Sequence, residues 1–275
     1  ETSGHEAAVF MPRFGQAHQQ YFTPKWITEA FLQIALGCFH LSSGRTLTVI
    51  DPTCGSGRLL APFAREGHKA LGVELDARLV PTARRVVGDK GYVLNGDVVQ
   101  YAPLLADRAY NEIFNVVATN PPYGLWWELP EGVQDTYELK SKSGQIESQA
   151  MILDLAKQIG GTRDTLLLGL FSGRFFENTP RALEFLKRNF QVVAHLTLPR
   201  PYEKEYDIKV NAAFVAAYRV NEHSEKKPIP LTGEWEGGAD SDSLAGFVVE
   251  AYESLNPNPY YRPSMTKEEA EKIAE

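Results

Sequence analysis

The segment Thr46–Arg58, with the sequence TLTVIDPTCGSGR, is the part of the chain that most directly predicts a fold. Its first five residues are apolar or β-branched, as in a buried strand. The turn Asp51–Arg58 follows, and in it Gly55 and Gly57 stand one residue apart. Two glycines so placed let the backbone bend sharply and approach a ligand at the start of a helix.

The spacing of these glycines bears on the kind of ligand that the turn accepts. A dinucleotide fingerprint would place a third glycine at position 60, where this chain has Leu60. A nucleoside cofactor without phosphates fits the same turn, with Asp51 facing a cation. The alternative is a purely structural turn that connects a strand to a helix.

Strand-like and helix-like segments alternate on both sides of this turn. Short apolar runs separated by amphipathic stretches are typical of βαβ units, and the last two runs follow each other closely enough for a hairpin. We therefore predict an α/β fold: a seven-stranded, mostly parallel sheet with helices on both faces and a C-terminal β-hairpin. The predicted strands are Thr46–Ile50, Ala70–Glu74, Gly91–Leu94, Ile113–Ala118, Thr165–Phe171, Gln191–Leu198 and Lys209–Val220. The predicted helices are Pro24–Leu41, Gly57–Glu66, Ala77–Val87, Ile146–Ile159 and Thr179–Asn189.

Composition and charge exclude several classes of protein. The 275 residues have a formal net charge of −7, which excludes a free-standing, non-specific nucleic-acid binder. Two cysteines cannot form a disulfide framework or a zinc site. No apolar run reaches the roughly 18 residues of a membrane span, and no signal peptide opens the chain, so we expect a soluble, cytoplasmic protein.

The charge is unevenly distributed along the chain. Residues 221–275 hold twelve acidic and five basic residues, which is the whole net charge, so residues 1–220 are neutral. The same stretch is rich in Pro and Gly, with one apolar island at Leu244–Tyr252. We therefore expect one domain over residues 1–220. Residues 221–275 would be an acidic linker or the start of a truncated following region.

Acidic residues follow two further predicted strands. Glu74 ends the second strand, where a carboxylate can accept hydrogen bonds from both hydroxyls of a ribose. Asp97 follows the third strand and could accept a hydrogen bond from an adenine amino group. Each acid alone could be a solvated residue at the end of a strand. Together with Asp51, they predict a ligand site at the carboxyl edge of the sheet.

The tetrapeptide Asn120-Pro121-Pro122-Tyr123 follows the fourth predicted strand. An Asn amide oxygen beside a backbone carbonyl offers two acceptors that can hold both protons of a planar amino group. The prolines make the loop rigid and remove amide donors that would compete. Tyr123 can stack on a flat substrate. An ordinary turn is the alternative, and the nearby cofactor site favours the catalytic interpretation.

Together these segments resemble the S-adenosylmethionine-dependent DNA adenine-N6 methyltransferases of restriction and modification systems. Asp51–Gly57 looks like the cofactor motif of that family, and Asn120–Tyr123 looks like its catalytic tetrapeptide. Upstream, Gln19–Pro24 is similar to the family's segment that contacts the methionine end of the cofactor. This order of segments matches the γ subgroup. The likeness covers about residues 15–220 and implies a Rossmann-like catalytic domain over residues 1–220.

The resemblance implies a cofactor, S-adenosylmethionine, and no metal. Thr23 and Asp51 would hold the methionyl group, Glu74 the ribose hydroxyls and Asp97 the adenine. The full set of cofactor-binding residues that it implies is Phe22, Thr23, Pro24, Asp51, Thr53, Gly55, Gly57, Glu74, Asp97 and Asn120.

It also implies how the target base would be held. Asn120 and the Pro121 carbonyl would hold the amino group, with Tyr123 stacked on the base. The family often supplies a second aromatic residue from the region between the last two strands, where this chain has Tyr202 and Tyr206. The long connection Gly124–Gln145 mixes aromatic residues with lysines, which suits a strand of nucleic acid or a partly ordered lid with anchored tryptophans.

The implied activity is methylation of the N6 amine of adenine in DNA, within a larger modification or phage-defence protein. The adenine would be flipped out or presented in single-stranded DNA. The residues after 220 are too few and too acidic for DNA recognition, so we expect a target-recognition domain or subunit outside this chain. Two alternatives stay open. One is a methyltransferase acting on a protein glutamine amide or a ribosomal RNA guanine amine, and the other is a non-catalytic methyltransferase-fold subunit.

Overall fold

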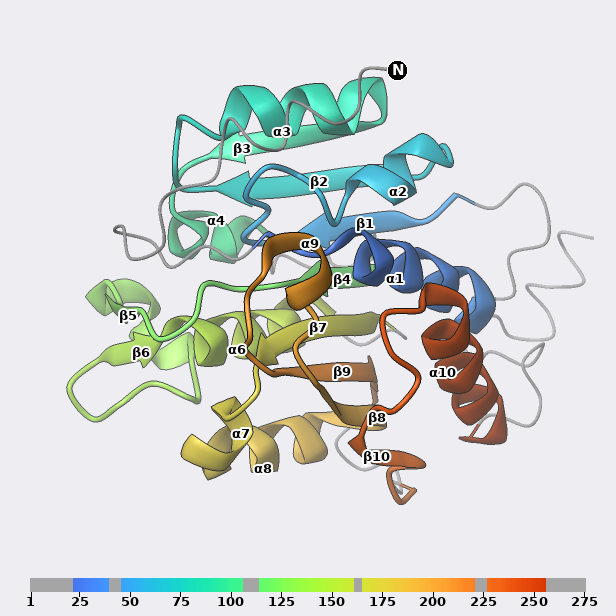
Figure 1. Cartoon of the computed structure of the whole chain (residues 1–275). Helices are drawn as coiled ribbons and strands as arrows, with labels where there is room; N and C mark the ends of the chain where they lie inside the picture. The colour runs from blue at the N-terminus through green and yellow to red at the C-terminus, as the bar shows by residue number, and fades with distance from the viewer. Residues whose placement is uncertain (1–21, 40–45, 106–113, 161–164, 221–226, 256–275) are drawn as a thin grey trace, which may run out of the picture.

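A single large sheet organises the chain, as a computed structural model shows for residues 22–39, 46–105, 114–160, 165–220 and 227–255 (Figure 1). The strand order is β10-β8-β9-β7-β4-β1-β2-β3. The strands are β1 (Thr48–Asp51), β2 (Lys69–Glu74), β3 (Gly91–Asn95), β4 (Val116–Thr119), β7 (Leu166–Ser172), β8 (Phe190–Leu198), β9 (Ala212–Arg219) and β10 (Leu231–Glu234). The predicted α/β fold and all seven predicted strands are therefore confirmed, and β10 is an eighth strand that the sequence analysis missed.

Strand direction explains where a ligand site can form. β1 pairs in parallel with β2 and β4, and β4 pairs in parallel with β7. β9 is antiparallel to both β7 and β8, which confirms the predicted hairpin. Because β1, β2 and β4 run in the same direction, their carboxyl ends meet at one edge of the sheet, the edge where open α/β sheets bind ligands.

Helices cover both faces of the sheet, and adjacent residues of each central strand serve different faces. In β1, Val49 packs into one hydrophobic core and Ile50 into the other. The helices of the first core are α1 (Lys25–Cys38), α2 (Ala61–Arg65), α3 (Val80–Val87) and α10 (Ser241–Leu255). Those of the second core are α4 (Val98–Leu105), α6 (Ser148–Gly160), α7 (Phe175–Asn178) and α8 (Pro180–Asn189).

Residues 227–255 belong to this layered unit, which corrects the predicted boundary at residue 220. β10 pairs in parallel with β8, and α10 lies beside α1 (Figure 1). The apolar side chains of α10 recur at helical spacing and are buried against the core: Leu244, Ala245, Val248, Ala251 and Leu255. The acidic, Gly-rich composition around them concealed this pattern. The interpretation of residues 221–275 as a linker is thus wrong for residues 227–255, and residues 256–275 lie outside the described part of the chain.

The long connection after β4 forms a small two-stranded sheet. β5 (Trp126–Glu128) pairs antiparallel with β6 (Gln145–Glu147), and a 3-10 helix, Glu131–Thr136, lies between them. Tyr137 is almost fully buried in the second core and anchors this insert. Across the described residues, no helix combines the length and the apolar character that crossing a bilayer requires.

Candidate active site

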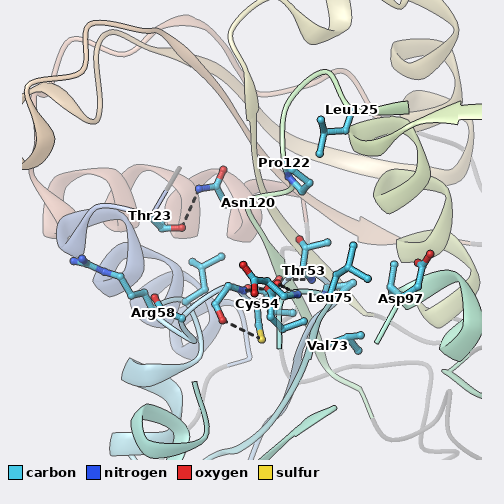
Figure 2. A pocket seen from close by; sticks show the side chains of 18 of the residues that line it. Thr23, Thr53, Cys54, Arg58, Val73, Leu75, Asp97, Asn120, Pro122 and Leu125 are labelled. Carbon is cyan, nitrogen blue, oxygen red and sulfur yellow. Dashed lines mark hydrogen bonds between the residues drawn. The ribbon is translucent and has the colours of Figure 1, made fainter. Parts of the chain in front are cut away.

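A cleft of about 890 Å³, counted to its open mouth, lies at the carboxyl ends of β1, β2 and β4 (Figure 2). Eight of the ten residues predicted to bind the cofactor line it: Phe22, Thr23, Asp51, Thr53, Gly55, Glu74, Asp97 and Asn120. Pro24 and Gly57 do not line it. Residues 19–21 of the upstream segment lie outside the described residues.

Gly55 and Gly57 have different structural roles in the turn. Gly55 has φ +54°, and a side chain there would meet nothing within 4 Å, so the backbone lies open. Gly57 has φ +82°, and a Cβ there would lie 3.2 Å from Cα of Ala83 in α3. Gly55 therefore lets a ligand approach the turn, whereas Gly57 lets the turn pack closely on α3.

Asp51 is a buried acid at the floor of the cleft. Only 2% of its surface is exposed, and its Oδ1 accepts a hydrogen bond from the Thr53 amide at 3.0 Å. Burial is the main cause that raises the pKa of Asp51, to about 8, and the charge of Glu74 raises it further. A bound cation would favour the ionised carboxylate.

The other two acids hold the backbone around the cleft. Glu74 accepts hydrogen bonds from the amides of Gly55 and Asp76, each at 2.7 Å. Asp97 accepts one from the Val99 amide at 2.9 Å, at the start of α4. Within the described ranges, no group of three or more His, Cys, Asp or Glu side chains is arranged to hold a metal ion.

Several features fit a nucleoside cofactor that carries a positive charge. The Thr53 hydroxyl is buried in the cleft wall and has no hydrogen-bond partner among the described residues, so it is available to a ligand. Asp51 supplies a carboxylate that lacks a cation within the described structure. Gly55 also lines the cleft, and a Cβ there would meet nothing within 4 Å, so the turn leaves room for a ligand at this point.

The side chain of Asn120 is held at both ends of its amide. Its Nδ2 donates to Thr23 Oγ1 at 3.1 Å, the bond drawn in Figure 2. Its Oδ1 accepts from the hydroxyls of Tyr123 at 3.2 Å and Tyr202 at 3.4 Å. Because both tyrosines point their hydroxyls at Oδ1, that oxygen is oriented as an acceptor.

Of the two tyrosines expected near the target base, the structure brings only Tyr202 to Asn120. Tyr206, at the end of α9 (Glu203–Tyr206), lies instead under the guanidinium of Arg58, 5.6 Å from the ring centroid. Arg58 also forms an ion pair with Glu205, and Arg58 lines the cleft. The segment that carries both tyrosines is thus tied to the cofactor side of the cleft.

The insert contributes walls that the sequence analysis did not assign to the cofactor. Leu125 and Trp127 line the cleft together with Met151 of α6. Trp126 points the other way and is 63% exposed. Alternation along β5 explains this difference, and it is the signal that could have separated the two tryptophans.

Comparison with known proteins gives a consistent fold. No protein-family model matches the chain. Over 129 residues the chain is 28% identical to a tRNA (guanine(10)-N2)-dimethyltransferase of Pyrococcus abyssi, a match that covers 42% of this chain and 38% of that relative. The match therefore spans well under half of the curated relative.

Solved structures resemble a much larger part of the chain. One, from Listeria monocytogenes, is described as a class I S-adenosylmethionine-dependent methyltransferase; it has a TM-score of 0.67 and 17% identity, over 90% of this chain and 74% of that one. Another is the methyltransferase subunit of a type I restriction-modification system from Streptococcus thermophilus, with a TM-score of 0.58 and 18% identity, over 87% of this chain and 54% of that one. The chain therefore has the Rossmann-like fold of class I methyltransferases.

Proposed function

We propose that this chain transfers a methyl group from S-adenosylmethionine to the exocyclic N6 amine of adenine in DNA, as the catalytic domain of a larger modification or defence protein. The observation that carries the proposal is the fixed carboxamide of Asn120 in the wall of the cleft, with Tyr123 and Tyr202 at its oxygen. A planar amino group needs such an acceptor, and a flat base needs aromatic neighbours.

The cleft residues provide for the cofactor. Asp51 and Thr23 would hold the charged methionyl end, Glu74 the ribose hydroxyls and Asp97 the adenine. Leu125 and Trp127 give the apolar wall that a purine ring requires. S-adenosylmethionine, when bound, supplies the methyl group as an electrophile.

The chain's own residues orient the amine. Asn120 Oδ1 would accept one N–H of the amine in place of one of the tyrosine hydroxyls, and the Pro121 carbonyl would accept the other N–H, so that the nitrogen lone pair faces the methyl group. One carbon–nitrogen bond forms as the carbon–sulfur bond breaks, and the nitrogen then releases one proton to water. Orientation and preorganised acceptors supply the rate.

A second candidate substrate is the N2 amine of guanine in RNA. The sequence match to a tRNA guanine-N2 dimethyltransferase favours it, because that amine is also planar and exocyclic. The tetrapeptide chemistry does not distinguish the two amines. The likeness to a subunit of a restriction-modification system favours DNA.

We also propose that target recognition lies outside the described part of this chain. The neutral charge of residues 1–220 supports this, since non-specific DNA affinity depends on cationic contacts with phosphates. A non-catalytic subunit is the less favoured alternative, because the acids and the tetrapeptide are all present.

The test is methyl transfer from labelled S-adenosylmethionine to three substrates in parallel. They are adenine-containing DNA, the same DNA with every adenine replaced by unsubstituted purine, which lacks the exocyclic amine, and unmodified tRNA. Mass spectrometry of the digested products would identify the modified base. N6-methyladenine in the first substrate alone supports the proposal. N2-methylguanine from tRNA alone would replace it with the second candidate.

A further inference from the structure

We infer that Glu147 and Ser148, at the start of α6, hold the backbone of the tetrapeptide Asn120–Tyr123 and act as positioning residues for methyl transfer. The inference rests on the proposed function and deepens it. Neither residue lies in a segment that resembles a cofactor or catalytic motif.

Ser148 is attached to the tetrapeptide directly. Its side chain is fully buried, and its hydroxyl donates to the Pro122 carbonyl at 2.6 Å. Its amide donates to the carbonyl of Leu125 at 2.8 Å. The first residue of α6 is therefore bonded to the chain on both sides of Tyr123.

Glu147 adds a contact just beyond Tyr123. One carboxylate oxygen accepts from the Gly124 amide at 2.9 Å. The other accepts from the amides of Gln149 at 2.9 Å and Ala150 at 3.1 Å, in the first turn of α6. The carboxylate thus caps the helix and holds the loop at the same time.

The central sheet supports this arrangement. The Gln149 side chain donates to Glu147 Oε1 at 3.0 Å and accepts from the Ser172 amide at 2.6 Å, at the end of β7. The loop after β4 is in this way connected to the next strand of the sheet. Gly124 has φ +70°, which lets the chain turn away toward β5 after these contacts.

The hydrogen bonds of Glu147 and Ser148 restrain the backbone torsions of the tetrapeptide that its prolines leave free. Proline fixes φ, so ψ is the remaining soft torsion of Pro121 and Pro122. Hydrogen bonds to the Pro122 carbonyl and the Gly124 amide fix the two peptide planes that flank Tyr123. A misplacement of about 1 Å at a reacting group can cost roughly a hundredfold in rate.

The rival explanation is that Glu147 only caps a helix. Glu147→Asp separates the two roles, because it keeps the charge and a capping side chain but is too short to reach Gly124 as well. Ser148→Ala removes the bond to the Pro122 carbonyl together with the longer contact, at 3.0 Å, of the same hydroxyl with Glu147 Oε1. Asp240→Ala is the matched control: Asp240 accepts from the Asp242 amide at 3.0 Å at the start of α10, away from the tetrapeptide.

The first measurement needs no substrate. Hydrogen exchange of the Gly124 amide should become at least about tenfold faster in Glu147→Asp and stay unchanged in Asp240→Ala. Unchanged exchange in Glu147→Asp would overturn the inference, whatever the substrate of the protein turns out to be.

The second measurement is single-turnover methyl transfer. Ser148→Ala and Glu147→Asp should each lower the rate by about tenfold to a hundredfold, with the Kd of S-adenosylmethionine within about twofold of wild type. Wild-type rates in both variants would overturn the inference, as would losses that only follow cofactor affinity. A wild-type protein that methylates no amine would contradict the proposed function instead, and the exchange result would still decide the role of Glu147.

Discussion

The hydroxyl oxygens of Tyr123 and Tyr202 lie 2.8 Å apart, although the residues are 79 positions apart in the chain. Both hydroxyls also reach Oδ1 of Asn120. The loop after β4 and the segment after β8 therefore meet at the atom that would bind the target amine. Tyr202 is fully buried and Tyr123 is 8% exposed, so a base that stacked on either ring would first have to displace part of this contact.

The ring of Tyr202 should matter more to substrate binding than its hydroxyl. Tyr202→Phe keeps the ring and leaves Tyr123 bonded to Asn120, so we expect kcat/KM within about tenfold of wild type. Tyr202→Leu removes the ring and leaves a smaller side chain; because Tyr202 is fully buried, the thermal unfolding of each variant has to be measured alongside its kinetics. Stacking of a base on an aromatic ring is worth about 1–3 kcal/mol, so we expect a further loss of about tenfold to a hundredfold. Steady-state kinetics on adenine-containing DNA would measure both, with Tyr206→Phe as the control; equal losses in both Tyr202 variants would contradict the stacking role.

Most of the fold could be predicted because its strands and turns depend on residues that are neighbours in the sequence. Elements whose place depends on contacts with distant residues could not be predicted. The strand at Thr48–Asp51 and its turn depend on neighbouring residues, so their pattern is visible in the chain. β10 is a short edge strand with mostly exposed side chains, and α10 is amphipathic within an acidic stretch. Their membership of the fold depends on β8 and α1, which lie far away in the sequence.

The same distinction holds for the site. Asp51, Glu74 and Asp97 could be predicted because parallel strands bring their carboxyl ends to one edge. The choice between Tyr202 and Tyr206 could not, because they lie about one helical turn apart and only tertiary packing sends one to Asn120 and the other to Arg58. Whether a residue of the insert faces the cleft was equally undetermined before the pairing of β5 with β6 was known.

The affinity for S-adenosylmethionine should rise with pH up to about pH 8. Burial raises the pKa of Asp51 to about 8 in the cofactor-free protein, and the ionised carboxylate is the form that a cationic ligand favours. Below this pKa, binding must expel a proton from Asp51, so Kd should increase by up to about tenfold for each unit of pH. Calorimetric titration between pH 6 and 9 would measure this slope.

Asp51→Asn is the control for that titration. The asparagine side chain cannot ionise, so the variant should have a larger Kd than wild type at pH 8. Its Kd should also lack the part of the pH dependence that the ionisation of Asp51 causes. Any ionisation of the ligand itself affects both proteins equally. Parallel pH profiles in wild type and Asp51→Asn would show that Asp51 does not bind the cationic end of the cofactor.

Truncating a core side chain of α10 should destabilise the whole domain. Leu244 is fully buried against the first core, and replacing a buried leucine by alanine costs about 2–5 kcal/mol. Glu250 on the exposed face of the same helix should change stability by less than about 0.5 kcal/mol when replaced by alanine. Urea unfolding would compare the two variants. Equal stability of Leu244→Ala and wild type would contradict the conclusion that residues 227–255 are part of the folded domain.

Replacing Asn120 by alanine should abolish most methyl transfer while leaving cofactor affinity close to wild type. Asn120 would contact the amine, which gains positive charge only as the methyl group arrives, and such interactions affect the rate more than ground-state binding. Loss of one preorganised partner typically costs about a hundredfold to a thousandfold. Asn120→Asp should retain more activity, since an aspartate still offers acceptor oxygens to the amine.

Single-turnover transfer to adenine-containing DNA is the measurement, with the recognition domain or partner added if the domain alone transfers nothing. Thr23→Val is an informative companion, because it removes the acceptor at 3.1 Å from Asn120 Nδ2 but leaves the amide itself in place. It should lower the rate less than Asn120→Ala does, since the tyrosine hydroxyls still hold Oδ1. If Asn120→Ala transfers methyl groups at the wild-type rate, the loop Asn120–Tyr123 has only a structural role, and the proposed chemistry has to be assigned to other residues of the cleft.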